Sequence, residues 1–163
     1  MILKSFEIGK LNLKKNPYIL LYGKNDGAKK EALAKLKLNN KIEKIISYDE
    51  KEILENEDIF YNQVLSASLF DDEKFILINR ASDKSLKIFD YILSKEINNT
   101  IIIVNAGILE KKSKIRNFFE KNPNFVVIPF YEDNFETLSV VANTFLKNKK
   151  IRISQSDLNL IIS

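Results

Sequence analysis

Five short runs of apolar residues recur along the chain, and the segments between them carry apolar residues at helical spacing. Each run is rich in Ile, Val, Leu and aromatic residues and is almost continuous, which is typical of strands buried on both faces. Strands that alternate with helices in this way favour a parallel sheet covered by helices. The sequence therefore predicts an α/β fold with a parallel five-stranded sheet and helices on both faces. The expected strands are 18–22, 44–48, 74–79, 100–104 and 125–128.

The segments between and after these runs predict helices. The apolar spacing indicates helices over 28–38, 57–67, 84–93, 112–120 and 135–147. Either Ser82 or Asp83 is expected to cap the third of them, because both side chains accept a hydrogen bond from a free helix N–H group. In the last helix, the side chains expected to face inward are those of Leu138, Val141, Ala142, Phe145 and Leu146.

The C-terminal end predicts a further domain. Ser154 and Asp157 have the spacing of a helix-capping box, and apolar residues follow them. A helix of one or two turns at this place would have nothing to pack against, so we interpret it as the start of a second domain. The expected organisation is an α/β domain over 1–135, then a connecting helix and the start of a truncated helical domain over 136–163.

The sequence contains no His, Cys or Trp, which restricts its chemistry. Nucleophilic catalysis that depends on His is excluded, and so are zinc sites, iron–sulfur clusters and disulfides. Carboxylates, Lys, Tyr, Ser and Thr remain. A carboxylate-held Mg²⁺ with a nucleotide is therefore the main enzymatic possibility.

Charge and hydropathy alone indicate no particular partner. The 26 basic and 22 acidic residues give a net charge of +4, and only Arg80, Arg116 and Arg152 of the basic residues are Arg. This balance permits contact with nucleic acid but does not argue for it. No apolar stretch is long enough to span a membrane, and the N-terminus lacks the apolar core of a secretory signal. We therefore expect a cytoplasmic protein without a membrane partner.

A turn that contains glycine and lysine follows the first expected strand. Its place between strand and helix matches that of a phosphate-binding loop, which requires the pattern GxxxxGK[ST]. With Gly23 aligned on the first glycine, Ala28 replaces the second glycine, and Lys29 matches the lysine. Lys30 stands where Ser or Thr would bind Mg²⁺. An ammonium group has no lone pair for a metal, so Lys30 cannot supply that ligand.

Two further features weaken a nucleotide site. Asp26 places negative charge inside the loop, although Gly27 and Lys29 could still hold an anion such as sulfate at the helix N-terminus. The third strand ends in Asn79 and Arg80, where ATP hydrolysis requires an acidic pair for Mg²⁺ and water. We interpret the loop as a strand-to-helix turn in a P-loop-type architecture without nucleotide hydrolysis and without a cofactor.

Three stretches of the sequence resemble a known family. They read LKSFEIGKLNLKKNPYILLYGKNDGAKKEAL, QVLSASLFDDEKFILINRAS and NNTIIIVNAGILEKKSKIRNFFEK, and they follow in order along essentially the whole chain. The chain resembles the N-terminal domain of the bacterial DNA polymerase III delta subunit, the clamp-loader subunit that binds and opens the sliding clamp. The resemblance implies an AAA+-like fold, a degenerate phosphate loop and no ATP hydrolysis. It also implies a full protein about twice as long, with a lid and a C-terminal collar domain.

The resemblance further implies a clamp-binding element at Ser68, Leu69 and Phe70. Two large apolar side chains after a helix could enter a hydrophobic pocket of the clamp. Clamp-binding peptides often have Gln three residues before this Ser, whereas Leu65 is in that place here and Gln63 lies two residues earlier. The alternative is that Leu69 and Phe70 cap the domain's own core. The implied partners are the sliding clamp (beta subunit), the gamma or tau and delta prime subunits, and primer-template DNA through the assembled complex.

The block 109–114 resembles the Leu-Asp-Lys-Arg-Ser-Lys signature of the same family. Lys111, Lys112, Lys114 and Arg116 then form either a solvated helix start or a contact for neighbouring loader subunits or DNA phosphate. Two other functions stay open beside a non-catalytic clamp-loader subunit. One is a P-loop NTPase with an aberrant phosphate loop, and the other is a DNA-binding domain that uses these four cations.

Overall fold

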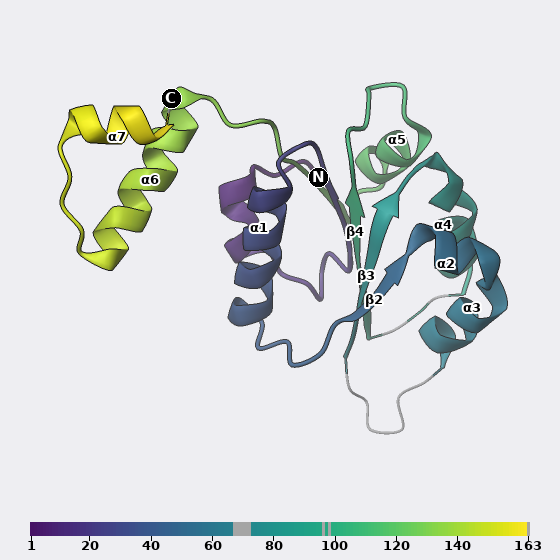
Figure 1. Cartoon of the computed structure of the whole chain (residues 1–163). Coiled ribbons are helices and arrows are strands. Elements are labelled where there is room, and N and C mark those ends of the chain that lie inside the picture. Colours follow the sequence, from purple (N-terminus) through teal and green to yellow (C-terminus); the bar gives the residue numbers. More distant parts are fainter. Residues whose placement is uncertain (67–72, 96, 98, 163) are drawn as a thin grey trace. The chain divides into compact units, whose positions relative to one another are not determined.

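A computed structural model of the chain describes residues 1–66, 73–95, 97 and 99–162 (Figure 1). Its contacts divide the chain into two compact units, Met1–Phe130 and Tyr131–Ser163. We name them the α/β unit and the helical unit and describe each by itself. The assignment of 136–163 to the start of a lid stays a prediction. Within the described residues, no helix is both long enough and apolar enough to cross a membrane.

The α/β unit is built on a parallel sheet of five strands in the order β2-β3-β4-β1-β5. This confirms the predicted α/β fold with its parallel five-stranded sheet. Each expected strand is present, and β3 and β4 extend two residues further because they pair to the end, Asn79 with Asn105 and Ala81 with Ala106. The strands are β1 (Tyr18–Tyr22), β2 (Ile46–Asp49), β3 (Lys74–Ala81), β4 (Thr100–Ala106) and β5 (Phe125–Pro129).

Helices cover both faces of this sheet, as Figure 1 shows. The 3₁₀ helix η1 (Ser5–Lys10) and α1 (Asp26–Asn39) lie on one face. The other face carries α2 (Glu50–Glu55), α3 (Glu57–Leu65), α4 (Leu86–Leu93) and α5 (Lys114–Lys121).

Side chains alternate between the two faces along each central strand, because successive residues of a strand point to opposite sides. In β1, Ile19 and Leu21 pack toward α1, whereas Leu20 and Tyr22 pack toward the opposite helices. Ile19, Leu20 and Leu21 have no exposed surface. The two cores explain why the strand sequences are continuously apolar and not alternating in polarity.

The helix α2 has no counterpart among the predicted elements. Its six residues include only two apolar ones, Ile53 and Leu54, too few for a helical period to appear in the sequence. The helix is instead fixed by polar contacts. Asp49 caps its N-terminus, and the buried Glu50 carboxylate accepts hydrogen bonds from the backbone N–H and hydroxyl of Ser82 and from the Ser85 hydroxyl.

The two candidate caps at 82 and 83 have different roles. Ser82 Oγ accepts a hydrogen bond from the Lys84 backbone N–H at 3.3 Å and caps the 3₁₀ turn η2 (Asp83–Ser85), which leads into α4. The Asp83 side chain contacts the start of α5, which lies on the same face of the sheet. Its Oδ1 accepts from Ser113 Oγ at 2.8 Å and from the Ile115 backbone N–H at 3.0 Å, and so holds the start of α5.

We expect Asp83→Ala to lower the free energy of unfolding by about 1 kcal/mol near neutral pH, through loss of two hydrogen bonds at an exposed site. The Ile115 hydrogen bond lowers the pKa of Asp83 below its ordinary value of 3.8. The carboxylate therefore stabilises the fold above pH 3.8, and this contribution is lost as the pH falls through the lower folded-state pKa. Urea unfolding over a pH series checks this. A stability difference that stays constant into acid would contradict the assigned role.

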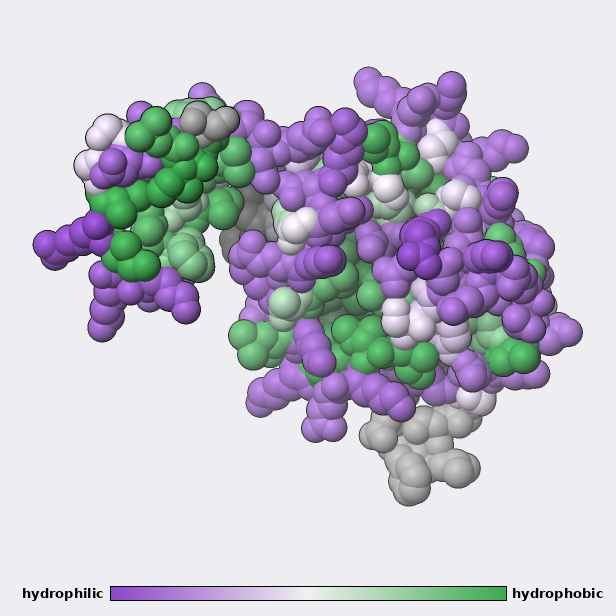
Figure 2. Space-filling model, viewed as in Figure 1, coloured by the Kyte–Doolittle hydropathy of each residue, from purple (hydrophilic) through white to green (hydrophobic). Residues whose placement is uncertain are grey.

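The helical unit consists of α6 (Phe135–Lys149) and α7 (Gln155–Ile162). Two expectations about it are wrong. The C-terminal helix α7, which was expected to have nothing to pack against, contacts α6 and buries Leu158. The expected inward face of α6 is in part exposed, since Val141 and Phe145 keep 54% and 57% of their surface. With only one neighbouring helix in this unit, α6 cannot bury its whole apolar stripe. Figure 2 shows apolar residues gathered on this unit.

Candidate functional site

The carboxyl ends of the strands form a polar pocket of about 640 Å³ in the α/β unit. Ligands of open α/β sheets usually bind at this edge, so it is the first place to look for a site. The N-terminus of α1 and the ends of β2, β3 and β4 surround it. Its lining residues are Asp26, Lys29, Lys30, Leu33, Ser47, Tyr48, Asp49, Glu52, Asn79, Arg80, Asn105, Ala106 and Gly107.

Gly23 is required by the fold at the start of the predicted phosphate loop. Its φ is +125°, and a Cβ on it would lie 2.0 Å from the carbonyl oxygen of Phe130. The chain after β5 passes this close because the Phe130 N–H donates to the Tyr22 carbonyl and the Asn25 N–H donates to the Phe130 carbonyl. Gly23 therefore allows β1 and the end of β5 to meet, and its presence does not require a phosphate ligand.

Lys29, the residue aligned with the phosphate-binding lysine, is turned into the protein. It is 3% exposed. Its Nζ donates to the carbonyl oxygens of Gly23 at 2.9 Å and Ala106 at 2.8 Å, and it lies 2.9 Å from the Asp26 carboxylate. An ammonium group has three N–H donors, and these three oxygens can use all of them. Lys29 thus joins the ends of β1 and β4 and has no free donor for a phosphate.

The N-terminus of α1 is closed by the chain's own oxygens. Asn25 Oδ1 accepts from the Ala28 backbone N–H at 3.0 Å. Asp26 supplies a negative charge in the first turn, where a bound anion would otherwise be favoured. The hydrogen bond and charge of Lys29 hold the pKa of Asp26 below its ordinary value of 3.8, so this carboxyl is ionised at neutral pH. A Cβ on Gly27 would lie 3.7 Å from Asn25 Oδ1, which is an ordinary van der Waals distance, so the packing at this position does not require a glycine.

The opposite wall of the pocket carries amides and an ion pair where a hydrolytic site needs acids. Asn79 Nδ2 donates to Ser47 Oγ at 2.8 Å, and Asn105 Nδ2 donates to Asn79 Oδ1 at 3.1 Å. Arg80 has a φ of +56° at an irregularity of β3 and pairs with the Asp49 carboxylate. Among the described residues, no group of three or more Asp or Glu side chains could hold a metal ion. Ser47, Asn79 and Asn105 are thus joined by hydrogen bonds, and Asp49 pairs with Arg80, whereas the buried Asn105 Oδ1 accepts no hydrogen bond within the described residues.

The predicted clamp-binding residues Ser68, Leu69 and Phe70 lie outside the described residues. The described residues on either side are fixed by a contact that the sequence did not indicate. Lys74, the first residue of β3, donates from Nζ to the Gln63 carbonyl at 3.1 Å and to Ser66 Oγ at 3.0 Å, and it also contacts the Ser66 carbonyl. The last turn of α3 and the start of β3 are thereby tied together.

The basic residues around α5 do not form one surface. Arg116 is engaged inside the α/β unit, since its Nε pairs with Glu120 at 2.8 Å, its Nη1 donates to the Leu109 carbonyl, and its guanidinium lies over the Tyr22 ring. Lys112 is exposed and lies 3.1 Å from the Glu110 carboxylate. Lys111 and Lys114 are exposed. The structure thus separates Arg116 from the lysines with which the sequence grouped it.

Comparison with known proteins places the fold. No protein-family model matches the sequence, and no curated protein sequence is significantly similar to it. Among solved structures, the chain is similar to the Bacillus subtilis DNA clamp loader delta protein (YqeN), with a TM-score of 0.65 and 14% identity over 97% of this chain and 51% of that chain. It is also similar to the Walker-type ATPase PABY2304 of Pyrococcus abyssi, with a TM-score of 0.52 and 13% identity over 97% of this chain and 61% of that one.

The chain thus spans about half the length of the clamp loader delta protein that it matches. At these identities the likeness concerns the fold. The fold of this chain, with its five-stranded parallel sheet, is similar to the folds of these two proteins.

Proposed function

We propose that this chain is a non-catalytic, delta-type subunit of a bacterial clamp loader, which binds and opens the sliding clamp during DNA replication in the cytoplasm. The observation that carries the proposal is the internal use of Lys29. In an AAA+-like fold this lysine is the residue that a nucleotide phosphate needs, and here two backbone carbonyls and Asp26 take its donors.

The other side of the pocket supports the same function. Asn79 and Arg80 stand where an ATPase requires acidic residues for Mg²⁺ and the attacking water. A cationic side chain at that place repels a metal ion, and the Asn79 amide is committed to Ser47 and Asn105. A chain with this fold and without hydrolysis acts through the surfaces that it offers to other proteins.

The proposed mechanism is a shift in the conformational equilibrium of the clamp. Leu69 and Phe70 would enter a hydrophobic pocket of the clamp and would bind its opened form more tightly than its closed form. A ligand moves such an equilibrium only by its difference in affinity for the two states. ATP hydrolysis would come from neighbouring gamma or tau subunits, and delta prime would complete the assembly on primer-template DNA.

Titration of the complete chain with ATP and Mg²⁺ separates this function from its rival, a P-loop NTPase with an aberrant loop. We expect no saturable heat of binding and no phosphate release above that of buffer. Tight Mg²⁺-dependent binding that is lost in Lys29→Ala would favour the NTPase and would contradict the proposal. The similarity to a Walker-type ATPase makes this the rival that matters most.

A further inference from the structure

Four cations stand together where α6 ends and the connection to α7 begins. All four are exposed, and within the described part of the chain none has an ion-pair partner. We name these residues the basic turn, and they are Lys147, Lys149, Lys150 and Arg152.

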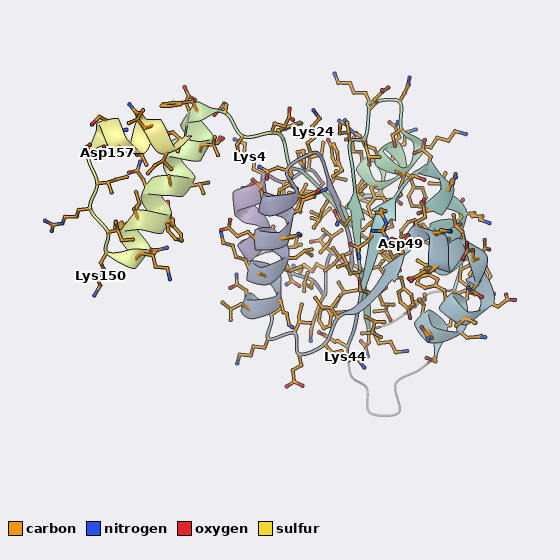
Figure 3. The ribbon with its side chains drawn as sticks, in the orientation of Figure 1. Lys4, Lys24, Lys44, Asp49, Lys150 and Asp157 are labelled. Atoms are coloured by element: carbon orange, nitrogen blue, oxygen red, sulfur yellow. The ribbon has the colours of Figure 1, made fainter. Side chains whose placement is uncertain are left out.

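The acidic residues of the helical unit lie elsewhere. Glu132, Asp133 and Glu136 precede α6 or belong to its first turn, at the other end of a helix of fifteen residues. Asp157 accepts a hydrogen bond from Ser154 Oγ at 2.7 Å at the start of α7, and Figure 3 shows it away from Lys150. The charge of this unit is therefore separated along α6, with all of its positive charge at the C-terminal end.

The backbone holds the basic turn in a defined shape. The Ile151 N–H donates to the Leu146 carbonyl at 2.9 Å, and the Lys150 N–H donates to the Lys147 carbonyl at 3.1 Å, which closes the end of α6. Lys150 adopts left-handed helical angles, φ 57° and ψ 31°. Gly or Asn usually occupies this position, because other side chains are strained there. A lysine at this position is a poorer choice for stability than Gly, and what it adds is charge.

We infer that the basic turn binds the phosphate backbone of nucleic acid. Unpaired cations on a short exposed turn can displace the counterions of a polyanion, which is the main source of backbone affinity. Three of the four are Lys, whose flexible ammonium group binds phosphate as a point charge. The inference stands apart from the proposed clamp binding, because it uses a different unit and different residues.

An anionic membrane fits the charge distribution less well. A helix that binds a membrane surface lies flat, with cations along its length. Here the cations stand only at the C-terminal end of α6, and Glu132, Asp133 and Glu136 stand at the other end. A nucleic acid strand needs to meet only one end of the helix. The surface also differs from the one expected from the sequence around 111–116, where Arg116 is engaged within the fold.

Fluorescence anisotropy with the complete chain and a labelled primer-template DNA tests the inference over a salt series. Four phosphate contacts predict a slope of log K against log[salt] of about −3 to −4. Lys147→Gln/Lys149→Gln/Lys150→Gln/Arg152→Gln is expected to bring the slope near zero and to weaken binding at low salt at least tenfold. The matched variant Lys111→Gln/Lys112→Gln/Lys114→Gln is expected to keep most of the slope.

A second pair of variants separates charge from stability. Lys41 also has a positive φ, 51°, at a turn of the α/β unit. Lys150→Gly and Lys41→Gly each relieve a left-handed lysine, so both are expected to keep or raise the melting temperature. Only Lys150→Gly is expected to reduce the salt slope, by about one unit.

Three results would overturn the inference. The first is that the parent chain does not bind DNA at low salt. The second is that the basic-turn variant and the parent chain have equal salt slopes. The third is that the basic-turn variant loses binding only to vesicles of phosphatidylserine and phosphatidylcholine and still binds DNA. Leu69→Ala/Phe70→Ala is expected to bind DNA as the parent chain does. Failure of the clamp proposal would therefore leave this inference standing, and the reverse also holds.

Discussion

Leu69→Ala/Phe70→Ala is expected to weaken binding of the complete chain to the sliding clamp by at least about 100-fold. Large apolar side chains that fill a partner's pocket contribute roughly 2 kcal/mol or more each, and each 1.4 kcal/mol is a factor of ten in Kd. The expectation rests on the resemblance of residues 68–70 to the clamp-binding element of the delta family. Surface plasmon resonance with immobilised clamp of the same organism measures the loss.

A matched control comes from the helix just before this element. Ile59 lies on α3 and is 58% exposed, so Ile59→Ala removes a similar apolar surface without touching residues 68–70. We expect it to bind the clamp with unchanged affinity. If Leu69 and Phe70 instead cap the domain's own core, the double variant will lower the melting temperature and leave the affinity of the remaining folded protein as it was.

Lys29→Met is expected to destabilise the fold by about 2–4 kcal/mol, although the residue aligns with a nucleotide-binding lysine. The substitution keeps the apolar stem and removes the ammonium group. The carbonyls of Gly23 and Ala106 then lose their common donor, and a buried acceptor left without a partner costs about 1–3 kcal/mol. Urea unfolding of the complete chain gives the difference in the free energy of unfolding.

Lys30→Met is the control for this substitution. Lys30 is the next residue of α1 and is exposed, so we expect a change below about 0.5 kcal/mol. The structural and the nucleotide-binding interpretations of Lys29 predict different effects on the free energy of unfolding. If Lys29 served only to bind nucleotide, Lys29→Met would change stability little. A Lys29→Met protein as stable as the parent chain would therefore refute the structural role.

The sequence was sufficient to predict the sheet, because burial on both faces leaves a continuous apolar run that few other structures produce. The runs at 18–22 and 100–104 are interior strands of the sheet, and every residue in them is buried. The departures of residues 23–30 from the phosphate-loop pattern GxxxxGK[ST] could also be identified from the sequence, since they depend on residue type alone. Lys30 and Arg80 are cations wherever the fold places them.

Contacts between residues far apart in the chain were not predictable. The carbonyl of Ala106 lies 77 residues from Lys29, and nothing in the sequence marks it as the acceptor that turns Lys29 inward. The Lys74 contact with Ser66 and the Glu50 contact with Ser82 are of the same kind. Short polar helices such as α2 depend on contacts of this kind, so the spacing of apolar residues in the sequence did not predict α2.

The most direct test of the account is a calorimetric titration of the complete chain into the sliding clamp, with and without ATP and Mg²⁺. A non-catalytic clamp-binding subunit needs no nucleotide for its own contact, because its phosphate loop is closed by Lys29 and Asp26. We expect saturable binding with the same Kd in both conditions. Absence of binding, or binding that appears only with ATP and Mg²⁺, would contradict the account.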